Sequence, residues 1–105
     1  MTKKYGKPDA NHSKIVNYIR SIGGVVLDCK SLINAFDILV GYKGKLYIIE
    51  IKNPERLLKK LPKKERLEKA LTKGERDCKI MFESVGCEYN IVESCEDINI
   101  LLDID

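Results

Sequence analysis

Histidine and closely spaced cysteines are scarce in this chain, and their scarcity excludes two common kinds of small protein. The only histidine is His12, and no two cysteines form a CxxC pair. Structural zinc sites take their ligands from close Cys or His pairs, so zinc is not expected. A disulfide framework is not expected either, because the chain has enough apolar sequence to build a core. All four cysteines are therefore predicted to be buried, reduced thiols: Cys29, Cys78, Cys87 and Cys95.

Long apolar runs are absent as well. No stretch approaches the ~18 consecutive apolar residues of a membrane span. The first residues are basic and lack the apolar segment of a secretory signal. With 105 residues, 44% hydrophobic and 33% charged, the chain fits one soluble domain over 1–105, without a membrane partner. Cytoplasmic residence is the expectation.

Charge is unevenly distributed along the chain, although the net charge is only +3. Residues 1–20 carry five Lys or Arg against one acid, and 55–76 carry nine against four. Residues 77–105 carry one Lys and eight acids. Such a molecule offers a polyanion one preferred face, so the pattern is compatible with nucleic-acid binding. A solvated lysine-rich surface is the alternative.

Apolar periodicity predicts seven elements in the order αβββαβα, an α/β or α+β mixed sheet with helices against it. Residues 1–10 form a flexible basic arm. Asn11 is the expected N-cap of the first helix, which ends at a Gly-Gly pair. Residues 25–27 form a short strand, and 36–52 form a hairpin that ends before Pro54.

The second half of the chain is less regular. Residues 55–70 are predicted to be a mobile basic excursion with at most a helical turn, because Pro62 interrupts a longer helical pattern. Capping-box spacing at Thr72–Glu75 opens the next helix, residues 87–93 form the fourth strand, and Ser94 caps a final helix. The inward faces of these two helices are predicted to carry Cys78, Met81, Phe82, Val85, Ile98, Leu101 and Leu102.

The hairpin contains three charged residues within strands that are otherwise apolar. A two-residue turn at Lys43-Gly44 would set Asp37 opposite Glu50, with Cβ atoms ~4.5–5.5 Å apart, and Lys52 on the same face. A slip of one residue would separate the carboxylates. The other face is predicted to be continuous apolar core, formed by Phe36, Ile38, Val40, Tyr47, Ile49 and Ile51.

This arrangement of charges favours phosphodiester hydrolysis. Two adjacent carboxylates repel each other unless a cation neutralises them, and hard oxygen ligands favour Mg²⁺ or Mn²⁺. A bound metal activates water and withdraws charge from phosphate, while Lys52 orients hydroxide or stabilises the transition state. The alternative is a surface hairpin in which Lys52 forms an ordinary ion pair, worth ~0–1 kcal/mol.

Asp37 followed by Glu50-Ile51-Lys52 on the next strand resembles the PD-(D/E)XK nuclease superfamily. With the flanking segments, over residues 11–102, the chain is similar to the stand-alone VRR-NUC proteins of phages. This resemblance implies a Holliday-junction-resolvase-like fold with a restriction-endonuclease-like αβββαβ core, DNA cleavage with Mg²⁺ or Mn²⁺, a homodimer, and a phage-infected or other prokaryotic cell. It implies metal ligation by Asp37, Glu50 and the Ile51 carbonyl, with Asp37, Glu50 and Lys52 as catalytic residues.

Three positions depart from the family pattern. Relatives commonly have glutamate where Lys14 stands, glutamine where Glu75 stands, and proline where Phe36 stands. Two functions stay open: an active endonuclease on branched, flapped or nicked DNA, or a DNA-binding or assembly module that kept the fold and lost activity. A nuclease acting on RNA is a third. Glu75 either completes the capping box or has a site role.

Residues outside the triad are predicted to bind phosphate. Lys14 faces DNA, and Lys30, Ser31 and Lys73 contribute with the basic arm and the 55–73 region. His12 either reaches the site or is solvated near the helix cap.

Overall fold

A computed structural model describes residues 10–53 and 60–104, in which four helices and four strands follow the order αβββααβα. The elements are α1 (Ala10–Ser21), β1 (Val25–Asp28), β2 (Ile38–Tyr42), β3 (Lys45–Ile51), α2 (Lys63–Lys69), α3 (Lys73–Glu83), β4 (Tyr89–Val92) and α4 (Cys95–Leu101). The predicted class, a mixed α+β sheet flanked by helices, is confirmed.

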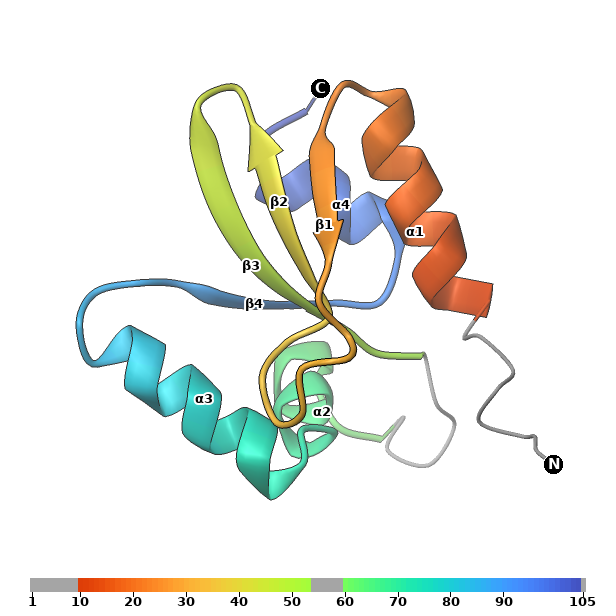
Figure 1. Ribbon diagram of the computed structural model, residues 1–105. Helices are drawn as coiled ribbons and strands as arrows, with labels where there is room; N and C mark the ends of the chain where they lie inside the picture. The colour runs from red at the N-terminus through yellow and green to blue at the C-terminus, as the bar shows by residue number, and fades with distance from the viewer. Residues whose placement is uncertain (1–9, 54–59, 105) are drawn as a thin grey trace, which may run out of the picture.

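The strands form one sheet in the order β1-β2-β3-β4. The first three strands are antiparallel neighbours, and β4 runs parallel to β3. Helices α1 and α4 lie on one face, whereas α2 and α3 lie at the other (Figure 1). A parallel neighbour requires a long crossover, and the segment containing α2 and α3 supplies it.

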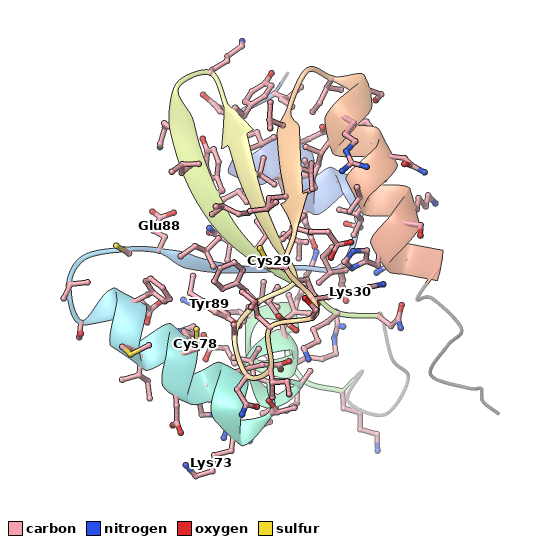
Figure 2. All side chains as sticks on the ribbon, viewed as in Figure 1. Cys29, Lys30, Lys73, Cys78, Glu88 and Tyr89 are labelled. Carbon is pink, nitrogen blue, oxygen red and sulfur yellow. The ribbon has the colours of Figure 1, made fainter. Side chains whose placement is uncertain are left out.

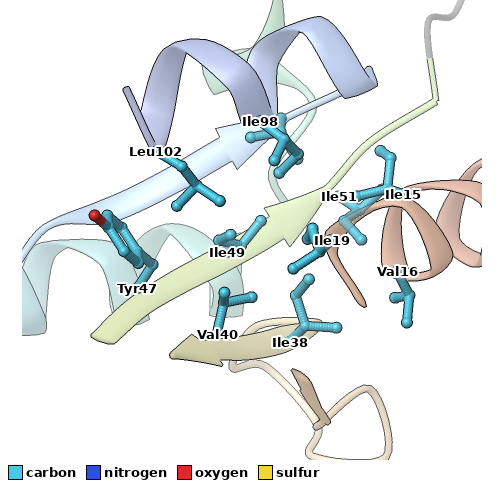
Figure 3. Packing of buried hydrophobic residues seen from close by; sticks show 11 residues of the cluster. Ile15, Val16, Ile19, Ile38, Val40, Tyr47, Ile49, Ile51, Ile98 and Leu102 are labelled. Carbon is cyan, nitrogen blue, oxygen red and sulfur yellow. The ribbon is translucent and has the colours of Figure 1, made fainter. Parts of the chain in front are cut away.

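The main core fills the space between the sheet, α1 and α4 (Figure 3). Alternate residues of β2 and β3 point into it, as the hairpin pattern predicts. Helix α1 contributes a stripe at helical spacing, and Gly23, at φ 96°, follows its end. The buried cluster consists of Ile15, Val16, Ile19, Ile38, Val40, Tyr47, Ile49, Ile51, Val92, Ile98 and Leu102.

A second, smaller apolar cluster lies on the opposite face, so the prediction of a core on one face only was wrong. Leu71, Cys78 and Tyr89 are its buried members. Phe36 belongs to this cluster rather than to the main core, and its ring meets that of Phe82 edge-on, 6.4 Å between centroids. The reason is that β2 begins only at Ile38, so strand alternation does not fix the direction of Phe36.

Two predictions about helix starts were also wrong. Helix α1 begins at Ala10, which places Asn11 inside its first turn. Pro62 does not prevent a helix; it occupies the N-cap of α2, where a missing N–H costs nothing. Residues 60–70 therefore include an ordered helix. The remainder of the predicted excursion, 55–59, and residues 1–9 of the arm lie outside the described residues.

The capping predictions for α3 and α4 are confirmed, but their apolar faces are narrower than predicted. Thr72 and Glu75 form a complete capping box, and the Ser94 side chain accepts from the Asp97 N–H. Met81 is exposed because the second cluster occupies only one stripe of α3, and Val85 is exposed because α3 ends at Glu83, before it. No helix within the described ranges is long and apolar enough to cross a membrane.

The four cysteines are free, but not all of them are buried. Cys29 and Cys78 are buried as predicted, whereas Cys95 is partly buried and Cys87 is exposed. Cys87 lies in the connection between α3 and β4, where neither apolar cluster covers it.

Truncating the centre of the main core should cost far more stability than truncating a surface residue. Ile49 is fully buried in β3, and Ile49→Ala is expected to lower the free energy of unfolding by about 3 kcal/mol. Ile100→Ala is the matched control, because Ile100 is exposed on α4, and its change should stay within about 0.5 kcal/mol. Urea unfolding of both variants measures the difference, and equal losses would contradict this assignment of the core.

Candidate active site

The turn of the β2–β3 hairpin has the predicted position and register. Tyr42 pairs with Lys45, and Val40 pairs with Tyr47. Lys43 and Gly44 both have positive φ, 48° and 84°, as a two-residue type I′ turn requires. The register that would bring the two carboxylates together is therefore present.

Asp37 lies one residue before β2, where the regular strand pairing with β3 stops at Ile38 and Ile49. Its backbone N–H donates to the Ile49 carbonyl (3.2 Å). Its side-chain Oδ2 accepts the backbone N–H of Ile51 at 2.8 Å. The Asp37 carboxylate is thereby fixed against the end of β3, beside the backbone that follows Glu50.

Lys52 joins two carboxylates. Its Nζ lies 3.3 Å from Glu50 Oε2 and 2.9 Å from Glu75 Oε1. The same Glu75 oxygen accepts the N–H of Thr72 at 2.9 Å, and the Glu75 N–H donates to the Thr72 hydroxyl. Glu75 thus has both roles that the sequence left open: it completes the cap of α3 and contacts the site lysine.

Glu50 is an ionisable residue in a buried place, only 3% exposed. Burial is the largest reason that its pKa is raised, to about 8, and the negative charges of Asp37 and Glu75 raise it further. The Lys52 ammonium acts in the opposite direction without cancelling them. Burial also raises the pKa of Asp37, against the Ile51 hydrogen bond and the charges of His12 and Lys52. For both carboxyl groups, burial therefore outweighs the positive charge nearby.

The pKa values of Glu75 and Lys52 shift in the directions expected of an ion pair. Burial opposes ionisation of Glu75, but the Thr72 N–H and Lys52 outweigh it and lower the pKa. Burial likewise opposes the charge of Lys52, but the hydrogen bond to Glu75 and the charge of Glu50 raise the pKa. Glu50 and Glu75 thus share the Lys52 ammonium; together with Asp37, whose charge acts on Glu50, they are named here the acidic cluster.

The second apolar cluster forms one side of this site. Figure 2 shows Cys78 on α3 and Tyr89 on β4. The Tyr89 hydroxyl donates to the Ala35 carbonyl at 2.7 Å. Burial, and then the charge of Glu50, raise the pKa of Tyr89; burial, Glu50 and Glu75 together raise that of Cys78. These two groups add no positive charge to the surroundings of Glu50.

Two α1 residues reach the site region in ways that sequence reasoning missed. The Asn11 amide donates to the carbonyls of Lys52 (2.9 Å) and Glu93 (3.1 Å), which ties the ends of β3 and β4 together. His12 is buried, not solvated, with Nε2 3.4 Å from Asp28 Oδ2. Helical spacing could have shown that His12 shares a face with Ile15, Val16 and Ile19.

The predicted phosphate-binding residues are on the surface, apart from the acidic cluster. Lys14, Lys30 and Ser31 are exposed, and exposed Lys73 pairs with Asp77 at 2.9 Å. Lys30 follows β1, whereas Lys73 is in the first turn of α3 (Figure 2). Among the described residues, none of the four contacts Asp37, Glu50 or Glu75.

The donors at the cluster fit a hard divalent cation. Asp37 and Glu50 supply carboxylate oxygens, and the Ile51 carbonyl comes from the residue between Glu50 and Lys52. Mg²⁺ is commonly held by one or two protein carboxylates, with water and substrate phosphate completing the shell. Within residues 10–53 and 60–104, no group of three His, Cys, Asp or Glu side chains is placed to hold a metal alone. The fit is therefore to a two-carboxylate site.

The chain was also compared with known proteins. No family model, no curated protein and no solved structure matches it.

Proposed function

We propose that this protein is a Mg²⁺- or Mn²⁺-dependent DNA endonuclease that hydrolyses phosphodiester bonds in branched or structured DNA, acting as a homodimer. One observation carries the proposal: Glu75 and buried Glu50 both pair with the Lys52 ammonium, and the charge of nearby Asp37 raises the pKa of Glu50. Buried charge without full compensation is costly, so it indicates a function that needs it.

Each residue of the site has a defined part in this proposal. Asp37 and Glu50 would hold the cation with the Ile51 carbonyl, and the Ile51 N–H keeps the Asp37 carboxylate in place. When bound, the metal supplies charge stabilisation at phosphate and lowers the pKa of its water. Lys52 offers its ammonium to the phosphate or to the attacking hydroxide. Glu75 is a positioning residue, since it holds Lys52 from a capped helix end.

A gel assay tests the proposal directly. The protein is incubated with a four-way junction, a flap, a duplex and a single strand, each with Mg²⁺, Mn²⁺ or EDTA. We expect metal-dependent products from a branched substrate and none in EDTA. A parallel RNA set separates DNA from RNA cleavage, because the 2′-hydroxyl and A-form geometry change recognition.

The second candidate is a DNA-binding module without catalysis. It is favoured by one observation: Lys14, where the nuclease family that the sequence resembles commonly has glutamate, is exposed and adds no carboxylate to the site. DNA binding with neither products nor a calorimetric Mn²⁺ site would establish this function and contradict the endonuclease.

Removing a surface cation should weaken DNA binding in a salt-dependent way. Lys30→Glu is expected to weaken binding about fivefold to tenfold at low salt and to reduce the slope of log K against log salt by about one. Lys43→Glu is the control, at an exposed lysine in the hairpin turn outside the predicted phosphate-binding set. Anisotropy titrations of both variants at several salt concentrations measure the change. If the slopes of log K against log salt were equal in the two variants, Lys30 would not contact DNA.

A further inference from the structure

Within residues 10–53 and 60–104, no element covers half of one sheet face. The side chains of β1 to β3 that point away from the main core meet α3 only near β4, and Figure 1 shows no helix in front of β1 and the first part of β3. Val25 and Leu46 are each 73% exposed, and Leu27 is 59% exposed. Scattered apolar residues are ordinary on protein surfaces, but these three lie on one face of adjacent strands.

The strand register arranges this surface in two rows. One row runs from Val25 across Gly41 to Leu46, and the next from Leu27 across Leu39 to Ile48. The Leu46 side chain comes within 4 Å of the position a Gly41 Cβ would occupy, so the first row has no gap between strands. None of the six positions is charged, although a third of the chain is. We call these six residues the open apolar face.

The sequence of these strands is that of strands covered on both sides. Val-Val-Leu in β1 and Leu-Tyr-Ile-Ile in β3 are continuous apolar runs, whereas a strand with one wet face alternates apolar and polar residues. In this structure the inward residues of these runs are buried or half-buried and the outward Ile48 is half-buried, whereas the outward Val25, Leu27 and Leu46 are exposed. A partner that packs on the outward residues would account for the pattern.

We propose that the open apolar face is where a second copy of this chain packs, sheet against sheet. A face without charge offers nothing to DNA phosphate, whereas two copies can bury it mutually without opposing like charges. Stable dimers bury about 800 Å² per partner, with an apolar centre and a polar rim. The two rows provide that centre.

The border of the face also suits self-association. A hollow of about 430 Å³ adjoins Leu39 and Leu46, and its lining includes Lys45 and Glu88, one charge of each sign. A two-fold arrangement can place the cation of one copy near the anion of the other. Glu88 stands at the start of β4 (Figure 2). The exposed thiol of Cys87 lines the same hollow and is a built-in reporter of whether it is covered.

The proposal rests on the homodimer proposed above, but not on the nuclease chemistry. The test is light scattering of the metal-free protein over a range of concentrations, without DNA. Wild type should reach twice 12.0 kDa, and Leu46→Lys should raise the dissociation constant at least tenfold. Ile100→Lys is the matched control, because Ile100 is 79% exposed on α4, outside the face, and should leave the constant unchanged.

Cys87 supplies a second readout. Its alkylation by a maleimide should slow as wild type dimerises and should stay fast in Leu46→Lys. A wild type that remains a single copy at every concentration, or a dimer that Leu46→Lys and Ile100→Lys affect equally, would overturn the proposal. Because no cleavage is measured, a dimer without nuclease activity leaves this inference standing. An active monomer removes this inference and the proposed homodimer, but leaves the nuclease chemistry.

Discussion

Replacing Glu50 with glutamine should abolish metal-dependent cleavage and, without metal, make the protein more stable at pH 8.5. Cleavage should fall at least ~100-fold, because one of the two metal-holding carboxylates is lost. The opposite change in stability follows from burial: the ionised side chain lies beside Asp37 and Glu75, and only Lys52 compensates it. An uncharged amide of the same shape removes this repulsion, so Glu50→Gln should raise the free energy of unfolding by on the order of 2 kcal/mol.

The raised pKa of Glu50 determines how the stability of the metal-free protein changes with pH. Burial and neighbouring charges raise the pKa of Glu50 from 4.5 to about 8 in the folded protein. The folded state therefore holds the proton more tightly than the unfolded state, so this group makes stability fall as pH rises between about 4.5 and 8. Wild type should lose melting temperature between pH 6 and 8.5 in EDTA, and Glu50→Gln should lose much less.

A matched control is available on α3. Asp77→Asn also removes one carboxylate, but Asp77 is exposed and pairs only with exposed Lys73, so the pH dependence should remain that of wild type. Calorimetry gives a further check, since Mn²⁺ binding to wild type near pH 7 should release a proton and Glu50→Gln should not bind. If Glu50→Gln and Asp77→Asn melted alike at both pH values, Glu50 would not be the destabilising charge.

Local patterns predicted the parts of the site that depend on neighbouring residues. The Lys43-Gly44 turn sets the hairpin register, and strand alternation then places Glu50 and Lys52 on one face. Capping-box spacing likewise predicts the start of α3. These features could be predicted because each depends on backbone geometry within a few residues.

The contacts that complete the site could not be predicted in this way. Lys52 and Glu75 are 23 positions apart, and Asn11 reaches carbonyls 41 and 82 positions away. Such contacts depend on how α1 and α3 pack on the sheet, which no local period encodes. The contact of Glu75 with Lys52 could not be inferred from the sequence, because the capping box with Thr72 is by itself a sufficient reason for a glutamate at that position.

Removing the single ammonium should have the opposite effect on stability from removing Glu50. Lys52→Met is expected to abolish cleavage and to lower the free energy of unfolding by about 3 kcal/mol in EDTA at pH 8.5, since it leaves buried carboxylates uncompensated. The pKa of Lys52 is raised by Glu75 and Glu50 despite burial, so the wild-type lysine is fully charged at this pH. Added Mn²⁺ should restore part of the loss.

The double variant Glu50→Gln/Lys52→Met separates charge compensation from simple packing. If Lys52 stabilises the fold by neutralising Glu50, the double variant should recover most of the stability lost in Lys52→Met, and the cycle should show coupling above about 1 kcal/mol. Lys73→Met is the control, because Lys73 is exposed and its pair with Asp77 should contribute little. Additive effects would mean that the two side chains act independently. If coupling is measured, the same incomplete neutralisation of the buried carboxylates explains why the metal-free acidic cluster destabilises the fold and why it would bind a divalent cation.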